Sequence, residues 1–318
     1  MFVGHATLAF AVVAGVAHRR GWDANAALAV GLVAAAFATV PDVDITYALV
    51  GVVGRLAGAG TGVSALALAG AFWSTGSLVH RAVTHSLVLA PVVALLATLW
   101  ALGTRRARAG ALALAAGLVA LAGLVSGPLG VVVTVPFVVV AGAVATVARR
   151  KTDLAPPTFF VTALFGLASH PFGDLFTGRP PAMCYPFDAT LFAHRIALSP
   201  DPTVQLLGAF GIELAAIWAG VLVACAVAGV RPTVHLRPRA SLGAGYAASV
   251  AVVPAPTLDL SYPFVFSVLA VGLLGLLPRL RLVGSRAVER PPWPSALTTG
   301  LAAVTVAWLA YAVAYLAL

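Results

Sequence analysis

Long apolar runs, separated by short polar motifs and small clusters of arginine, make up most of the chain. Most of these runs have about 17 to 25 residues, and a helix of that length crosses a hydrocarbon core of about 30 Å. The pattern therefore predicts an all-α, polytopic integral membrane bundle of roughly eight to eleven transmembrane helices. The runs cover residues 6–17, 24–40, 63–79, 87–103, 110–126, 129–148, 154–169, 203–230, 240–258, 260–277 and 295–318.

The composition favours lipid over water as the main solvent of the chain. Hydrophobic residues make up 61% of it and charged residues only 9%, with a mean hydropathy of +1.02, whereas a soluble domain carries roughly 25% charged residues. The N-terminus lacks the basic region of a signal peptide, and Arg19 and Arg20 follow the first apolar run. That order predicts an uncleaved first helix whose N-terminus lies outside the cytoplasm.

The net charge of +9 comes largely from arginine clusters between apolar runs, a pattern typical of cytoplasmic loops and not of nucleic-acid binding. With these clusters in the cytoplasm, alternate crossings place the polar motifs on the extracytoplasmic side of a multi-pass cell-membrane protein. This assignment requires segment 45–79 to cross an even number of times. Its first apolar piece, 45–54, is too short to span, so we expect an interfacial or re-entrant segment. The clusters lie at residues 18–20, 105–108, 149–151, 231–239 and 279–290.

Two short motifs near the N-terminus carry candidate metal ligands. His5 stands in GHATLAF, and Asp42 and Asp44 form PDVD at the end of an apolar run. Pro41 disfavours continuation of the helix, and carboxylates two residues apart in extended backbone point the same way, so both reach one cation. The alternatives are a solvated histidine and a polar helix end, although aspartate at a helix C-terminus is unfavourable for the helix dipole.

A third motif, HRAVTHS, combines His80, Arg81, Thr84 and His85 between two apolar runs. On a regular helix the two histidines would lie about 140° apart, so one shared site needs a local break or two metal ions. Arg81 lies one turn from His85 and suits a phosphate or another anion. The alternative is an interfacial loop in which Thr84 or Ser86 caps the following helix.

A fourth motif, HPFGD, places His170 and Asp174 at i and i+4, on one helical face and able to chelate one ion. Pro171 fits the first turn of a helix, and the alternative is an ordinary helix cap. A polar, proline-rich stretch of about thirty residues follows. Arg179 there is a candidate substrate-binding residue, and His194 and Arg195 are weaker candidates for the site.

Imidazole and carboxylate together form a ligand set that suits Zn²⁺ well and Mn²⁺ or Fe²⁺ less specifically. A metal ion activates water for hydrolysis, and the chain has no nucleophile elbow, P-loop or HExxH motif. We therefore expect Asp44 or His85 to act as general base, and Arg81, Thr84 and Arg179 to hold an anionic substrate. The predicted ligands of one or two ions are His5, Asp42, His80, His85, His170 and Asp174.

Together, GHATLAF, PDVD, HRAVTHS and HPFGDLFTG resemble the membrane-bound, metal-dependent hydrolase family known from LexA-regulated bacterial proteins and formerly a domain of unknown function. That family looks distantly related to the zinc phospholipase C and P1 nuclease group. The resemblance covers about residues 1–200 and departs mildly at Ala82, where members often have glycine. It implies a hydrolase domain over 1–200 that acts on phosphate esters, with helices 201–318 completing the bundle.

The sequence thus predicts an integral membrane metal-dependent hydrolase whose partners are membrane lipids and a lipid or small-molecule phosphoester. The alternative is a transporter or channel that binds a cation or proton at the same His/Asp cluster. A non-catalytic lipid-binding or scaffold protein is a third possibility and predicts no stoichiometric metal. Oligomeric state and the identity of the substrate do not follow from these motifs.

Overall fold

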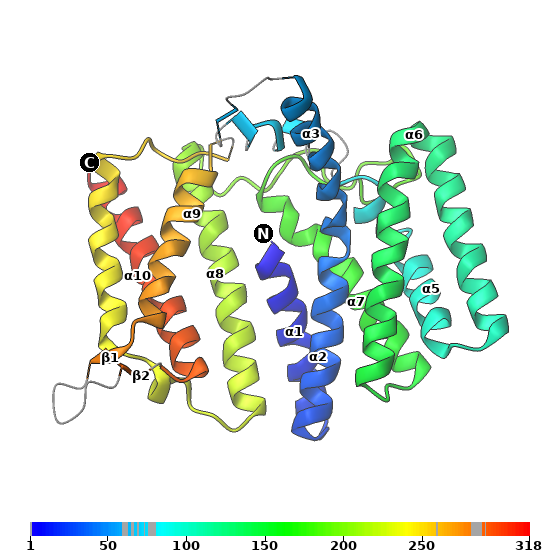
Figure 1. Cartoon of the computed structure of the whole chain (residues 1–318), viewed down its shortest axis with the longest axis horizontal. Coiled ribbons are helices and arrows are strands. Elements are labelled where there is room, and N and C mark those ends of the chain that lie inside the picture. Colours follow the sequence, from blue (N-terminus) through cyan, green and yellow to red (C-terminus); the bar gives the residue numbers. More distant parts are fainter. Residues whose placement is uncertain are drawn as a thin grey trace. The chain divides into compact units, whose positions relative to one another are not determined.

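The computed structural model (Figure 1) describes residues 2–58, 63–64, 67–68, 70–72, 74–75, 81–258, 260–280, 288–289 and 291–318. The chain divides into two compact units, Met1–Arg195 (unit 1) and Ile196–Leu318 (unit 2). The division lies close to the boundary predicted at residue 200. His80 and about half of the apolar run 63–79 lie outside the described residues, so the crossings predicted for 45–79 stay a prediction.

The described residues are predominantly helical, and five of their helical stretches are long and apolar enough to cross a membrane. The only regular strands within the described ranges are the two-residue strands β1 (Arg279–Leu280) and β2 (Val288–Glu289), which pair antiparallel. The prediction of an all-α, polytopic membrane protein is therefore confirmed. The five stretches are Ala24–Gly58, Arg105–Lys151, Pro156–Phe176, Pro202–Val227 and Trp293–Ala317.

Unit 1 packs its helices around a core of phenylalanine and small residues, including Phe37, Phe137 and Phe159. Helix α2 contacts both α1 and α7, while α5 contacts α6 and α7. Its elements are α1 (Phe2–Arg19), α2 (Ala24–Thr39), η1 (Pro41–Tyr47), α3 (Ala48–Gly58), η2 (Val83–His85), α5 (Ala90–Leu102), α6 (Arg105–Lys151), α7 (Pro156–Gly173) and η3 (Asp174–Phe176), where η marks a 3₁₀ helix.

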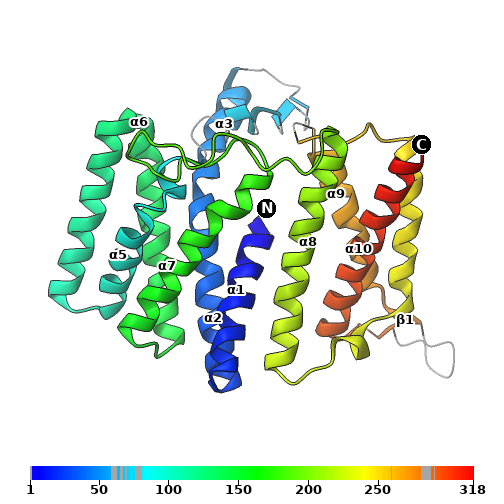
Figure 2. The same cartoon turned by 180° about the vertical axis from the view of Figure 1, so that it is seen from behind.

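Helix α6 is a helical hairpin that reverses at Gly127. The residue has φ 65° and ψ −157°, a conformation that glycine adopts without steric cost, and Pro128 then starts the second arm. Figure 1 and Figure 2 both show the two arms side by side. The predicted pair of apolar runs, 110–126 and 129–148, is thereby confirmed as two helices joined by a tight reversal.

Unit 2 has its own core, in which Phe264 and Tyr311 pack with ring centroids 5.0 Å apart and Phe210 lies against Phe264. Helix α10 contacts α8, α9 and the 3₁₀ helices η5 and η6. The elements are α8 (Pro202–Val227), η4 (Pro232–His235), η5 (Pro238–Ala251), α9 (Tyr262–Ala270), η6 (Val271–Leu276), the strands β1 and β2, and α10 (Trp293–Ala317).

The chain does not break at Pro41 as the sequence suggested. Residues Pro41–Tyr47 form a 3₁₀ helix that connects α2 directly to α3. Proline occupies the first turn of this 3₁₀ helix, where its missing N–H costs no hydrogen bond. The PDVD motif therefore lies in tightened helix, and the prediction of extended backbone there is wrong.

Candidate metal centre

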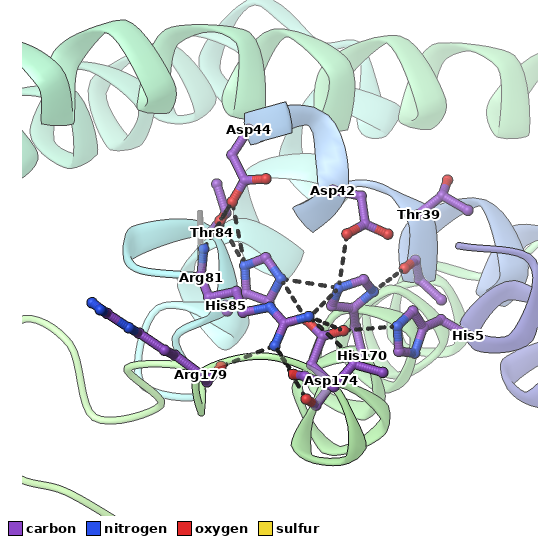
Figure 3. A network of polar contacts seen from close by, with 12 residues as sticks. His5, Thr39, Asp42, Asp44, Arg81, Thr84, His85, His170, Asp174 and Arg179 are labelled. Atoms are coloured by element: carbon purple, nitrogen blue, oxygen red, sulfur yellow. Dashed lines mark hydrogen bonds and ion pairs between the residues drawn. The ribbon is translucent and has the colours of Figure 1, made fainter. Parts of the chain in front are cut away.

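Five predicted ligands from five elements, α1, η1, η2, α7 and η3, meet at one end of the unit 1 helices (Figure 3). His5 comes from the first turns of α1, Asp42 from η1, His85 from η2 and His170 from the last turn of α7, while Asp174 directly follows α7. All five are buried, with exposed fractions of 0% for His170, 1% for His85 and 2% for Asp174. We call these five residues the His/Asp cluster.

Asp174 joins the three histidines of the cluster. Its Oδ1 lies 3.2 Å from Nε2 of His5, and its Oδ2 lies 3.1 Å from Nε2 of His85. Its Oδ2 also lies 3.6 Å from Nε2 of His170, the i, i+4 partner. The predicted convergence of His170 and Asp174 on one helical face is present in the structure.

In two cluster histidines, Nδ1 points away from the cluster and donates a hydrogen bond, which shows that this nitrogen carries a proton. Nδ1 of His170 donates to the carbonyl oxygen of Ala38 at 2.7 Å. Thr84 Oγ1 donates to Asp44 Oδ2 at 2.7 Å and therefore accepts from Nδ1 of His85 at 2.8 Å. Each ring thus carries a proton on Nδ1, and in the neutral imidazole Nε2 presents a lone pair to the cluster.

The two Nε2 atoms of His85 and His170 face each other at 3.1 Å. Two lone pairs at that distance repel unless a cation lies between or beside them. Asp42 adds a second indication, because its buried Oδ2 has no hydrogen-bond partner among the described residues and an unsatisfied buried oxygen is costly. The arrangement therefore fits a positive charge held by the cluster.

The geometry offers two sets of three ligand atoms for such a cation. His5, Asp42 and His170 form one set, and His85, His170 and Asp174 form the other, with all ligand atoms in each set within 4.8 Å of one another. Histidine nitrogens oriented by carboxylate or carbonyl partners are the usual environment of protein metal ligands. Burial lowers the pKa of His85, so its imidazole stays neutral and able to ligate below its usual titration range.

In a 3₁₀ helix the side chains of residues i and i+2 point in different directions. The two PDVD carboxylates therefore contact different groups of the site. Asp42 Oδ1 lies 3.4 Å from Nε2 of His170, inside the cluster. Asp44 Oδ2 accepts from Thr84 Oγ1 and from the backbone N–H of Arg81 at 3.2 Å, and lies 3.5 Å from Nδ1 of His85. Asp44 therefore orients His85 from behind, and these contacts do not favour the general-base role predicted for it.

Arg81 connects the HRAVTHS segment to the chain after α7. Its guanidinium donates to Asp174 Oδ1 at 3.2 Å, to Thr177 Oγ1 at 3.0 Å and to the carbonyls of Asp174, Thr177 and Arg179. Its backbone has a φ of 73°, a conformation that costs a non-glycine residue free energy. The guanidinium is therefore engaged by the protein itself, and its predicted grip on a substrate anion stays a prediction.

Two other predicted features differ from expectation. HPFGD closes α7 and does not open a helix, because α7 begins at Pro156 and Pro171 lies in its last turn. Arg179 is exposed, and Figure 3 shows its side chain extending away from the His/Asp cluster. Only the Arg179 carbonyl contributes to the network, by accepting from Arg81 at 2.9 Å.

The motifs did not identify two residues on which the cluster depends. Gly173 lies against His5, and a Cβ at that position would overlap the His5 ring. The carbonyl of Ala38 orients His170, a role that no side-chain motif reveals. The glycine within HPFGD was the available signal, because glycine inside a helical turn often marks a close approach of another group.

Comparison with known proteins gives one match. The family model described as YdjM inner membrane protein matches residues 1–255, a range that includes the whole His/Asp cluster. No curated protein and no solved structure matches the chain. The family description supports the membrane-bound part of the resemblance drawn from the motifs, and it names no reaction, metal or substrate.

Proposed function

The chain belongs to the YdjM inner membrane protein family, and from this premise we propose that it is an integral membrane, metal-dependent hydrolase of phosphoesters. The observation that carries the proposal is the buried pair of facing Nε2 atoms on His85 and His170, with Asp174 Oδ2 3.1 Å from the first of them. Ionisable groups buried in membrane proteins are costly and are usually retained for function.

In the proposed centre, His85, His170 and Asp174 hold the cation, which is most simply Zn²⁺ because its preferred ligands are histidine and carboxylate. When bound, the ion supplies Lewis acidity that favours ionisation of water and polarises a phosphoryl oxygen. Asp44 and Ala38 fix the proton-bearing sides of the two imidazoles. His5 fixes the second oxygen of Asp174 at 3.2 Å.

We assign proton transfer to Asp42. Within the described chain, two buried carboxylate oxygens lack a hydrogen-bond partner, Oδ2 of Asp42 and Oδ2 of Asp174. Asp174 is assigned as a ligand, which leaves Asp42 as the general base, because that role needs a free acceptor oxygen within reach of water. In the reaction, the water oxygen forms a new P–O bond while Asp42 takes one proton from the water, and the ester P–O bond breaks. The leaving alkoxide takes that proton from Asp42 and departs as an alcohol. Asp42 replaces Asp44 and His85 in this role because both of those residues are engaged in orienting or ligating contacts.

The test is hydrolysis by the purified, full-length protein reconstituted in phospholipid vesicles. We expect release of p-nitrophenol from bis(p-nitrophenyl) phosphate, loss of that activity after treatment with a chelator, and its return on addition of Zn²⁺. The variant Asp42→Asn should retain the metal and lose turnover. Absence of hydrolysis across soluble and lipid phosphoesters, with the metal loaded, would refute the proposal.

A cation or proton transporter is the second candidate, and one observation favours it. The 3.1 Å separation of the two Nε2 atoms also suits a proton shared between the imidazoles, and the complete burial of both rings is typical of intramembrane proton relays. Uptake of protons or Zn²⁺ into vesicles without hydrolysis, abolished by His170→Ala, would favour transport over the enzyme.

A further inference from the structure

The chain that follows the metal centre exposes large apolar side chains without forming a helix. Residues 187–195, here called the interfacial segment, have no helix or strand and are exposed throughout. The exposed fractions are 66% for Phe187, 58% for Leu191 and 37% for Phe192. Water solvates such side chains poorly, so this surface needs an apolar neighbour.

The interfacial segment starts where the chain leaves the His/Asp cluster. Just before it, Met183 O accepts from the backbone N–H of Leu87 at 2.8 Å, and Tyr185 O accepts from Ser86 Oγ at 2.5 Å. The Tyr185 hydroxyl also lies 3.1 Å from Ser126 Oγ. These contacts hold residues 183–185 against the elements that build the site. Figure 2 shows the green ribbon after α7 continuing as an extended segment.

Lipid is the partner that fits this surface. The segment joins α7 to α8, both long and apolar enough to span, so it must lie on one side of the bilayer at the level where these helices end. Phe172, in the last turn of α7, is also 48% exposed. His194 and Arg195 are exposed in the same segment, and Arg binds phosphate at a membrane surface.

We propose that the interfacial segment inserts Phe187, Leu191 and Phe192 at the boundary between head groups and acyl chains, and that the neighbouring site takes its phosphoester from phospholipid head groups in that layer. The substrate part of this inference rests on the proposed function, whereas the insertion part does not. Interfacial anchoring of this kind gains free energy from apolar burial and from attraction between basic side chains and phosphate.

Depth measurements test insertion without any reaction. In a Cys184→Ser, Cys225→Ser background, a nitroxide is attached at Phe187→Cys, Leu191→Cys or Phe192→Cys, with Asp188→Cys and Thr190→Cys as matched neighbours. In vesicles of phosphatidylethanolamine and phosphatidylglycerol, the first three labels should collide more with oxygen than with a water-soluble nickel chelate. Labels at Asp188→Cys and Thr190→Cys should collide more with the nickel chelate than with oxygen. Predominantly aqueous collisions at all five positions would overturn the proposal.

Activity then tests the substrate class. The triple variant Phe187→Ser, Leu191→Ser, Phe192→Ser should hydrolyse vesicle phospholipid about tenfold more slowly than the unaltered protein, with unchanged metal content and an unchanged rate on bis(p-nitrophenyl) phosphate. An equal loss on both substrates, or no loss on lipid, would overturn the lipid assignment. If the unaltered protein hydrolyses neither substrate, the proposed function fails, and the nitroxide depths still decide insertion.

Discussion

Units 1 and 2 bury very different kinds of polar side chain, although both are bundles of apolar helices. Unit 1 buries His5, Asp42, Asp44, His85, His170 and Asp174. In the described part of unit 2 the buried polar residues are neutral: Thr203, Gln205, Ser295, Thr298 and Thr299. Burial of ionisable groups costs far more than burial of hydroxyls, which find partners in nearby carbonyls.

The neutral polar residues of unit 2 have an evident structural purpose. Thr299 Oγ1 donates to the carbonyl of His235 and accepts from the backbone N–H of Arg237, each at 3.2 Å. Hydrogen bonds of this kind satisfy the backbone where chain segments meet. The cluster of unit 1, by contrast, leaves two carboxylate oxygens, Asp42 Oδ2 and Asp174 Oδ2, without a hydrogen-bond partner within the described chain, whereas the corresponding group in unit 2 is Nε of Arg239. Unit 1 therefore buries costly ionisable groups that packing alone does not require, whereas the neutral polar groups of unit 2 hold chain segments together.

The largest effect should follow from Asp174→Asn, which keeps the shape of the side chain and removes the charge shared by His5, His85 and His170. We expect loss of bound metal and a decrease in hydrolysis of at least about 100-fold, because a carboxylate ligand is gone. Elemental analysis and the phosphodiester assay measure the two effects. If Asp174→Asn kept both its metal and its turnover, the buried ionisable groups of unit 1 would not differ in function from the buried polar groups of unit 2.

A smaller loss is expected for Asp44→Asn, which acts through His85. The amide of Asn keeps one acceptor oxygen for Thr84 but lacks the negative charge that lies 3.5 Å from Nδ1 of His85. Removal of such an orienting partner typically weakens metal affinity by about 10- to 100-fold. Competition with a chromogenic chelator measures this affinity. Asp44→Glu should recover part of it, and equal affinities in the Asn variant and the unaltered protein would argue against an orienting role.

Gly173→Ala should have a more modest effect, because the added methyl group displaces only the His5 ring. We expect turnover to fall by about fivefold to tenfold, since small displacements of positioned groups slow catalysis. Gly117→Ala in α6 is the matched control, because a Cβ there meets no atom within 4 Å. Similar rates for the two variants would show that close packing of His5 against α7 is unimportant.

The smallest functional effect should come from unit 2. Thr299→Val leaves the Arg237 N–H without its acceptor, at a cost of about 1 to 3 kcal/mol in stability, while the His235 carbonyl still accepts from Ser295 Oγ at 2.7 Å. A lower thermal midpoint with full metal content is the expected result, checked by scanning fluorimetry and elemental analysis. Loss of metal in this variant would mean that the chemistry does not depend on unit 1 alone.

Side-chain spacing predicted those parts of the site that depend on local geometry. The i, i+4 pair of His170 and Asp174 needed only the helical period. The apolar runs predicted the five stretches that are long enough to span, but most of run 240–258 lies in the 3₁₀ helix η5, where a transmembrane helix was expected. The direction of Asp42 and Asp44 was wrong because Pro41 starts a 3₁₀ helix where a break was expected. That choice depends on how α2 continues into α3, which residue patterns do not specify.

The sequence motifs could not predict the long-range contacts of the site, for a different reason. The Ala38 carbonyl is 132 residues from His170, and main-chain carbonyls have no residue-type signature. Arg81 looked like an anion-binding side chain, yet its two terminal nitrogens donate to groups of residues 174–179. Such partners become apparent only when the packing of α7 against the other elements is known.

X-ray absorption at the zinc edge of the purified, Zn²⁺-loaded protein tests the central claim most directly. A centre built from His85, His170 and Asp174 should give nitrogen and oxygen ligands at about 2.0 to 2.2 Å, with the multiple scattering of imidazole. In Asp174→Asn the stoichiometric signal should be lost. A spectrum of hydrated zinc, or the same zinc content in both proteins, would contradict a metal centre at the His/Asp cluster.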